Sequence, residues 1–276
     1  MKTLIFKLSM VLLALTITSC SNEDLSLMEQ KEHSKQHKKG KNVLRFVTYN
    51  IHGGKGPNNE GDLKSNLEAF KKLLSSEEVL FLQEVQPHQV EAVKNIYDDF
   101  PHSFYTKIEA DSYWDWGTFS FKKRESGQII LSKIPFQIKH EKLIQKDPGG
   151  DHWERKAQEV TLEMSNKRKL QFFHYHNTYN WNLDDFASEK EGMIKYRNYV
   201  EERIDETSYN LSNNLIMLGD FNLFKEDITE IINTKAHAFN GRDHINSMIP
   251  FLKSGSYNTF SKKLSDHDAV WAEIDY

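Results

Sequence analysis

The chain has 276 residues, of which 38% are hydrophobic and 12% aromatic, and this composition excludes a disordered, fibrous or collagen-like protein. The net charge of −4 does not mark the chain as a bulk polyanion binder, although an active site needs only local positive charge. The single cysteine, Cys20, excludes an intrachain disulfide.

Residues 1–20 have the features of a bacterial lipoprotein signal peptide. A basic start precedes a short apolar run, residues 8–17, which is too short to span a bilayer comfortably. The run leads into Ile-Thr-Ser-Cys, which resembles a lipobox, the motif whose cysteine is lipidated in that family. The alternative is an ordinary signal peptide with an incidental cysteine. We expect lipid on Cys20 to hold the protein at a membrane surface of the cell envelope, outside the cytoplasm.

The next segment, residues 21–42, is polar, contains no aromatic residue and shows no sustained apolar period. This pattern is typical of a flexible tether. Neither an internal repeat nor a second linker follows. We therefore expect residues 43–276 to form one domain, and the protein to be a monomer.

Strand and helix signals follow one another through this domain. Runs rich in β-branched and aromatic residues predict strands at 43–50, 79–82, 128–131, 136–143, 157–164, 170–176, 214–218, 244–251 and 269–274. Helical patterns follow Asp62 and cover residues 88–97 and 184–205. The order mixes antiparallel-like runs with strand–helix–strand units, which favours an α/β sandwich of two sheets with outer helices.

Polar side chains gather where the predicted strands end. A single polar residue after an apolar strand only marks the start of a loop, but here the same carboxylate, amide and imidazole groups recur at several strand ends. Sites in α/β proteins are built at such edges. The residues are Asn50, Glu84, His176, Asp220, Asn222, Asp266 and His267.

These groups suit a hard divalent cation and acid–base chemistry. Carboxylate and amide oxygens are ligands for Mg²⁺ or Mn²⁺, and histidines exchange protons near neutral pH. Zinc is less favoured because the sequence has no HExxH or Cys/His ligand spacing. The sequence also lacks a P-loop, a GxGxxG fingerprint and a GxSxG elbow.

The ordered motifs TYNIHGG, FLQEV, SGQIILSKIP, HYHNTYN, LGDFN, RDHI and SDHDAV resemble the endonuclease/exonuclease/phosphatase superfamily, the DNase-I-like proteins. The resemblance covers nearly all of residues 43–276. It implies a four-layer αββα sandwich of two mixed β-sheets flanked by helices. It also implies cleavage of phosphoester bonds with a divalent metal, usually Mg²⁺, for which Mn²⁺ can substitute.

The resemblance assigns most of the site residues a role. Glu84 would be the principal metal ligand, helped by Asn50 and Asp266. Asp220 and Asn222 would orient or activate the attacking water and contact the transferring phosphate.

The resemblance further makes His267 the catalytic histidine of the SDH motif, and Asp243 would orient its ring. Two residues depart from the family pattern here. Arg242 stands where an apolar residue is common, and His244 replaces the usual aromatic residue.

The second histidine of the site would be His176, which would donate to phosphate or protonate the leaving oxygen. His174 lies on the same face of the predicted strand, so which of the two is catalytic stays open. Asn177 and Arg155 are expected to bind substrate, since an arginine fork suits phosphate. An exposed ion pair is the alternative for Arg155.

We therefore expect an extracytoplasmic, metal-dependent phosphoesterase that hydrolyses phosphodiester bonds, with a nuclease acting on DNA or RNA as the first choice. A lipid phosphodiesterase of the sphingomyelinase type is the alternative, motivated by the anchor and by the aromatic segment at Tyr113, Trp114 and Trp116. A degenerate member that acts as a surface binding protein is the third possibility. The complete set of acids and histidines argues against it.

Overall fold

The computed structural model describes residues 42–109, 113–115, 120–122, 125–146, 153–179, 187–206 and 213–276. The expected signal peptide with Cys20 and all but the last residue of the expected tether lie outside these ranges. Trp116 and the side chains of Tyr113 and Trp114 also lie outside the described part.

Two six-stranded sheets form the centre of the fold. The first sheet has the strand order β13-β14-β1-β2-β6-β3. In it β1 and β2 are parallel, and every other neighbouring pair is antiparallel. Its strands are β1 (Val43–Asn50), β2 (Val79–Gln83), β3 (His102–Glu109), β6 (Glu125–Ser132), β13 (Phe251–Tyr257) and β14 (Ala269–Asp275).

The second sheet repeats this pattern with the order β11-β12-β10-β9-β8-β7. Here β9 and β10 form the single parallel pair. Its strands are β7 (Phe136–Lys146), β8 (Glu154–Glu163), β9 (Lys169–Tyr175), β10 (Leu215–Asp220), β11 (Ala236–Asn240) and β12 (Asp243–Ser247). A small separate hairpin pairs β4 (Tyr113–Asp115) with β5 (Ser120–Lys122).

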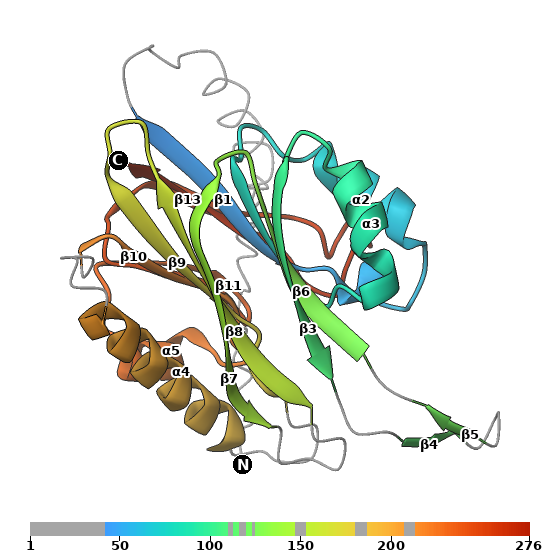
Figure 1. The fold of residues 1–276 in the computed structure, drawn as a ribbon. Helices are drawn as coiled ribbons and strands as arrows, with labels where there is room; N and C mark the ends of the chain where they lie inside the picture. Colours follow the sequence, from blue (N-terminus) through green and yellow to red (C-terminus); the bar gives the residue numbers. More distant parts are fainter. Residues whose placement is uncertain are drawn as a thin grey trace, which may run out of the picture. The chain divides into compact units, whose positions relative to one another are not determined.

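Helices cover the outer face of each sheet (Figure 1). The first sheet packs against α2 (Leu63–Lys71) and α3 (Val90–Ile96), and a 3₁₀ turn, η2 (Pro87–Gln89), precedes α3. The second sheet packs against α4 (Ala187–Glu206) and α5 (Lys225–Ile231). A further 3₁₀ turn, η1 (His52–Gly54), follows β1. The predicted four-layer αββα sandwich is confirmed.

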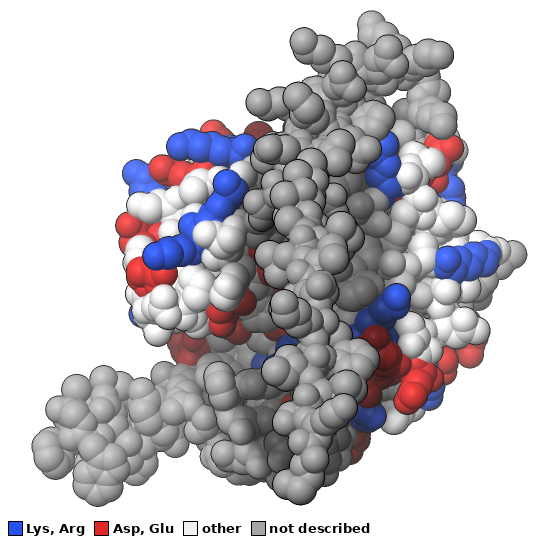
Figure 2. All heavy atoms as spheres, turned by 180° about the vertical axis from the view of Figure 1, so that it is seen from behind, with Lys and Arg blue, Asp and Glu red and all other residues white. Residues whose placement is uncertain are grey.

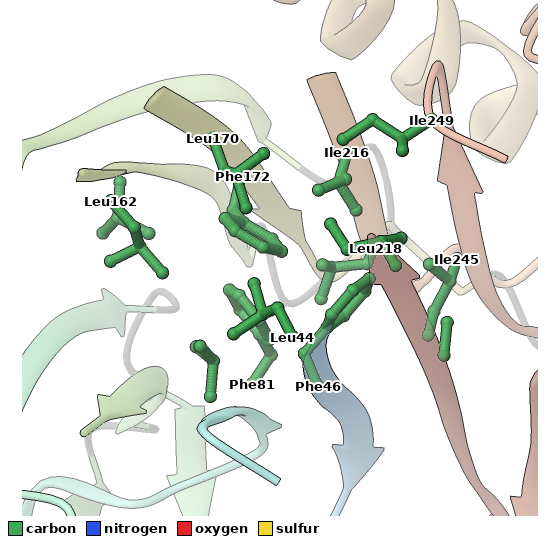
Figure 3. Packing of buried hydrophobic residues seen from close by; sticks show 14 of the residues in the cluster. Leu44, Phe46, Phe81, Leu162, Leu170, Phe172, Ile216, Leu218, Ile245 and Ile249 are labelled. Atoms are coloured by element: carbon green, nitrogen blue, oxygen red, sulfur yellow. The ribbon is translucent and has the colours of Figure 1, made fainter. Parts of the chain in front are cut away.

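The inner faces of the sheets pack on each other through large apolar side chains. Figure 3 shows Phe46 and Phe81 of the first sheet facing Phe172 of the second. The ring centres of Phe46 and Phe172 are 5.2 Å apart in an edge-to-face arrangement, which aromatic pairs favour. Separate apolar clusters lie between each sheet and its helices. The two sheets are thereby packed on each other and on their helices, and this packing positions the strand ends that carry the predicted site residues.

The predicted strands and helices agree with the structure within a few residues, except for the run 244–251. This run is not one strand. β12 ends at Ser247 in the second sheet, and the chain then crosses to the first sheet, where β13 begins at Phe251. The apolar pattern continues across the break because Ile249, between the strands, is buried in the core between the sheets.

Among the described residues, no helix is long and apolar enough to cross a membrane. Lys and Arg side chains are interspersed with Asp and Glu over the described part of the face in Figure 2. This mixture agrees with the small net charge of the chain.

Candidate active site

The strands that carry the predicted site residues meet at one edge of the sandwich. The carboxyl ends of the parallel pairs β1–β2 and β9–β10 supply Asn50, Glu84, His176 and Asp220. β12 and β14 run antiparallel to these strands, so their amino-terminal ends lie at the same edge. Asp243 begins β12, and the loop before β14 supplies the remaining acid and histidine, Asp266 and His267.

A cavity of about 990 Å³ opens at this edge. Its lining contains eight of the ten predicted site residues, namely Glu84, Arg155, His176, Asp220, Asn222, Asp243, Asp266 and His267. The structure therefore brings together groups that are far apart in the sequence. The other two, Asn50 and Asn177, are buried beside the cavity.

Asn50 links the acids of the two sheets. Its side-chain nitrogen donates to Glu84 Oε1 at 2.9 Å and to Asp220 Oδ2 at 3.0 Å. Its side-chain oxygen accepts from the backbone nitrogen of His52 at 3.0 Å. One oxygen of Glu84 and one of Asp220 thus converge on Asn50 Nδ2, where the two sheets meet.

Four residues of the cavity lining have a left-handed backbone although none is glycine. The φ angles are 48° at His52, 60° at Asn59, 59° at Glu84 and 53° at Asn222. Such conformations cost of order 1–3 kcal/mol each and concentrate at functional sites. At Asn222 the strain accompanies a turn in which its backbone nitrogen donates to Asp220 Oδ1 at 3.0 Å.

Asp243 and His267 form a tight pair. His267 Nδ1 lies 2.6 Å from Asp243 Oδ2, and His267 Nε2 lies 3.7 Å from Asp220 Oδ2. Burial alone would lower the pKa of His267, but Asp243, Asp220 and Asp266 raise it well above its ordinary value. The raised pKa favours the protonated ring, and the 2.6 Å contact keeps a proton on Nδ1, the nitrogen that faces Asp243. The other nitrogen is directed towards the acids of the cavity.

The structure separates the two candidate histidines, His174 in β9 and His176 directly after it. His176 lines the cavity, with its Nε2 3.6 Å from Asp220 Oδ2 and 4.0 Å from Glu84 Oε1. Burial lowers its pKa, although the charges of Asp220 and Glu84 oppose that shift. His176 and His267, together with the Asn50 amide, act in turn on Asp220. Burial alone would raise the pKa of Asp220, but His267, His176 and Asn50 together lower it.

His174 is instead a core residue between the two sheets. It is fully buried, its Nδ1 lies 2.9 Å from Gln158 Oε1, and Gln83 donates to its Nε2. Its ring packs edge-on against Phe81, with 5.4 Å between ring centres. It does not line the cavity, so we assign the second catalytic histidine to His176.

Asn177 does not contact the cavity, and its predicted contact with substrate is corrected. It is fully buried, its Nδ2 donates to the backbone oxygens of Glu189 and Phe221, and its Oδ1 accepts from Thr178 N. These bonds tie the segment after β9 to α4 and to the segment after β10. Asn177 therefore positions the site rather than binding substrate. Arg155, by contrast, lines the cavity, and its charge lowers the pKa of His176.

The lining is suited to a divalent cation. It contains six carboxyl groups, from Glu84, Glu125, Asp220, Asp243, Asp266 and Asp268, against four basic groups, from Lys55, Arg155, Arg242 and His267, whose pKa is raised. A negative cavity of this kind repels a phosphate unless a cation offsets its charge. Convergent carboxylate oxygens are the donors that Mg²⁺ and Mn²⁺ prefer.

One group of three possible ligand atoms, from Asp220, Asp243 and His267, lies within 4.8 Å of one another. His267 and Asp243 in this group already share a hydrogen bond, which a metal ion on His267 Nδ1 would have to break. A metal ion on His267 Nε2 would leave that bond intact, but it would occupy the nitrogen that faces the acids of the cavity. We therefore keep the predicted ligands Glu84 and Asp266, next to Asp220. Asn50 would join them only by giving up the bond that its oxygen accepts from His52 N.

The sequence patterns missed an aromatic and basic part of the lining. Tyr179, Phe224, Arg242 and Phe260 all line the cavity. Tyr179 follows His176 by three residues, Phe224 follows Asn222 by two, and Arg242 precedes Asp243. The only signal in the sequence was that these four residues lie near the motifs or near other predicted site residues. Aromatic and basic residues are also ordinary in loops, so this signal could not single them out.

The sequence profile of the endonuclease/exonuclease/phosphatase family matches residues 47–267, most of the chain. The chain belongs to this family. Membership supports a hydrolase that acts on phosphoester bonds. A search of curated proteins gave no match to this chain.

Several solved structures share the fold. A family protein from Beutenbergia cavernae has 15% identity and a TM-score of 0.59, covering 84% of this chain and 71% of its own. One from Bacteroides thetaiotaomicron has 14% identity and a TM-score of 0.56, covering 86% and 99%. TDP2 of D. rerio, complexed with a single-strand DNA product, has 14% identity and a TM-score of 0.56, covering 85% and 100%. At these identities the likeness concerns the fold.

Proposed function

We propose that this chain is a divalent-metal-dependent phosphodiesterase of the cell envelope, held at a membrane by lipid on Cys20, and that its substrate is nucleic acid. The observation that carries the proposal is the convergence of Glu84, Asp220 and the Asp243–His267 pair in one cavity. Structural neighbours include a TDP2 protein bound to single-strand DNA product, which favours nucleic acid within the class.

In this proposal Glu84, Asn50 and Asp266 would hold the ion, Mg²⁺ or Mn²⁺, which when bound would offset negative charge on the phosphate. Asp220 and the Asn222 amide orient the attacking water. The Asp220 carboxylate suits this task because its lowered pKa keeps it ionised.

The two histidines act on the phosphate and the leaving group. His267, with its proton on the nitrogen that faces Asp243, presents Nε2 to a phosphoryl oxygen or to water. His176 donates to phosphate or to the leaving oxygen. Arg155 supplies a fork of donors that matches phosphate geometry.

A substrate panel tests the proposal. Plasmid DNA, RNA, sphingomyelin, phosphoinositides and bis-p-nitrophenyl phosphate are each offered with Mg²⁺, with Mn²⁺ and with EDTA. We expect hydrolysis of nucleic acid that EDTA abolishes and the metal restores, and a loss of activity at low metal in Glu84→Gln. Full activity in EDTA would refute the metal requirement. Cleavage of lipid alone would make the protein a lipid phosphodiesterase.

A further inference from the structure

Three residues of the cavity form a stack that the chemistry above does not use. The guanidinium carbon of Arg242 lies 4.5 Å from the ring centre of Tyr179 and 5.6 Å from that of Phe224. All three residues line the cavity. We call them the Arg242 stack.

The backbone holds the Arg242 stack close to the reacting groups. The backbone oxygen of Arg242 accepts from Phe221 N at 2.9 Å, which ties the β11–β12 turn to the segment that carries Asn222. Gly241 makes this turn with a φ of 59°. Arg242 is followed directly by Asp243, the partner of His267. A ligand at the stack therefore lies in the same cavity as the reacting groups.

Large aromatic surface is exposed at this place. Phe224 is 46% exposed, and Phe260, also in the lining, is 51% exposed. In the same chain Phe46, Phe81 and Phe172 are fully buried. Exposed rings that gather in a polar cavity indicate a ligand with an apolar or aromatic face.

The positive charge of Arg242 decides which class of ligand the Arg242 stack can bind. Aromatic faces can bind a quaternary ammonium, such as the choline of sphingomyelin, but the rings of Tyr179 and Phe224 already contact a guanidinium. A second cation would be repelled there. A planar nucleobase that carries its own phosphate is attracted, because arginine stacks on π-systems and favours anions.

We propose that the Arg242 stack binds a nucleobase next to the scissile phosphate, which makes single-stranded nucleic acid the substrate. In a duplex both faces of a base are covered by its neighbours, so only an unpaired base can reach the Phe224 ring. This inference rests on the proposed nuclease function and goes beyond it, because it names the residues that select the strand.

The test compares two oligomers that have equal phosphates and differ only in their bases. One is oligothymidylate, and the other is an abasic oligomer of the same length built on tetrahydrofuran sugars. Wild-type protein is expected to show a kcat/KM for oligothymidylate that exceeds the abasic value by roughly fivefold to hundredfold, the range typical of one stacked base. Phe224→Leu and Arg242→Lys should bring the ratio close to one. Arg242→Lys keeps the charge but removes the planar stack.

The chain offers a matched control pair. Lys225 Nζ lies 4.9 Å from the ring centre of Phe239, which is 44% exposed, and neither residue belongs to the cavity lining. Phe239→Leu and Lys225→Gln should keep the wild-type ratio. Circular dichroism of each variant checks that it is folded.

Each outcome decides the proposal. If wild-type protein cleaves both oligomers equally well, or if Phe224→Leu and Arg242→Lys keep the wild-type ratio, the subsite is refuted while the nuclease function stands. If the protein cleaves sphingomyelin vesicles and neither oligomer, both proposals fail. If it cleaves no substrate, fluorescence anisotropy measures the dissociation constants of the two oligomers, each labelled with fluorescein, and the abasic value is divided by the oligothymidylate value. A ratio near one for wild-type protein refutes base binding at the Arg242 stack. A larger ratio that Phe224→Leu removes supports it.

Discussion

His174 and His176 are two residues apart, at the end of β9, and have opposite surroundings. His174 lies between the sheets, where two glutamine side chains contact its ring nitrogens. His176 follows the end of β9, where the cavity begins. The alternation of side chains along a strand predicts that both histidines lie on the same face of the sheet. Their distance from the end of the strand decides which of them lines the cavity. Position relative to the sheet edge is a property of the fold and not of the local sequence.

The burial of His174 predicts a pH dependence of stability. Burial lowers the pKa of His174 from 6.5 to about 3, so between these values the unfolded chain binds a proton that the folded protein does not. Stability rises with pH when the unfolded state binds more protons. The contribution of His174 is therefore fully present above pH 6.5 and is lost as the pH falls towards 3.

The slope should be about 1.4 kcal/mol per pH unit below pH 6.5. His174→Gln removes this titration and leaves an amide that can bond to the same glutamines. Urea unfolding of both proteins at pH 6.5 and pH 5 measures the difference, which we expect to be about 2 kcal/mol. Parallel losses of stability in the two proteins would show that His174 is not buried in its neutral form.

The Asp243–His267 pair predicts non-additive kinetics. His267→Ala should lower kcat by roughly 10²- to 10⁴-fold, the usual contribution of a positioned acid or base. Asp243→Asn should cause much of the same loss, because the 2.6 Å contact fixes which nitrogen carries the proton. The double variant should be little worse than His267→Ala alone, since the two residues act as one unit. Losses that add in log kcat would show independent roles.

At the scale of the elements, five strands were missed by the sequence patterns: β4 and β5 form the separate hairpin, and the other three are edges of the two large sheets. β3 and β13 are the two edges of the first sheet, and β11 is an edge of the second. An edge strand is paired on one side only, so its side chains are half exposed and their apolar pattern is weak. These edge strands are stabilised by backbone hydrogen bonds to the neighbouring strand and not by an apolar pattern of their own. The short helix α5 was missed as well, and within it only Ile228 is buried.

A glycine of the LGDFN motif is required by the packing of two strands. Gly219 has a φ of 142°, and a Cβ atom there would lie 1.9 Å from the backbone oxygen of Tyr175 on the parallel strand β9. Neither backbone can move away without disturbing the sheet. Gly219→Ala should therefore destabilise the protein by more than about 4 kcal/mol.

Gly241→Ala is the matched control for this variant. Gly241 also has a positive φ, 59°, but nothing lies within 4 Å of an added Cβ. The cost should then be only the backbone strain of about 1–2 kcal/mol. Thermal unfolding of both variants measures the difference. Equal destabilisation would mean that backbone conformation, and not the approach to Tyr175, makes glycine necessary at position 219.

At the scale of the whole molecule, the expected anchor predicts where the protein is found. Lipid on Cys20 would keep it in the membrane fraction, because acyl chains partition into the bilayer. Cys20→Ser should release the protein into the soluble fraction and change its electrophoretic mobility. The variant should keep its specific activity on oligonucleotides, since the family match begins at residue 47. Unchanged localisation and mobility would rule out lipidation at this cysteine.

The sequence by itself determined the family and most of the residues that gather at the site. Motifs such as LGDFN and SDHDAV combine a strand end with a polar group, and both features are local in the chain. Strand periodicity was equally local, and it placed the central strands within a few residues.

Only the tertiary structure decided how these residues act. It removed His174 and Asn177 from the cavity, split the run 244–251 between two sheets, and added the Arg242 stack to the lining. Each of these facts depends on contacts between segments far apart in the chain. Asn50 and Asp220, for example, are 170 residues apart and share a hydrogen bond. Burial, distance and pKa arise only when two such segments pack together, and a pattern within one segment carries no information about the other.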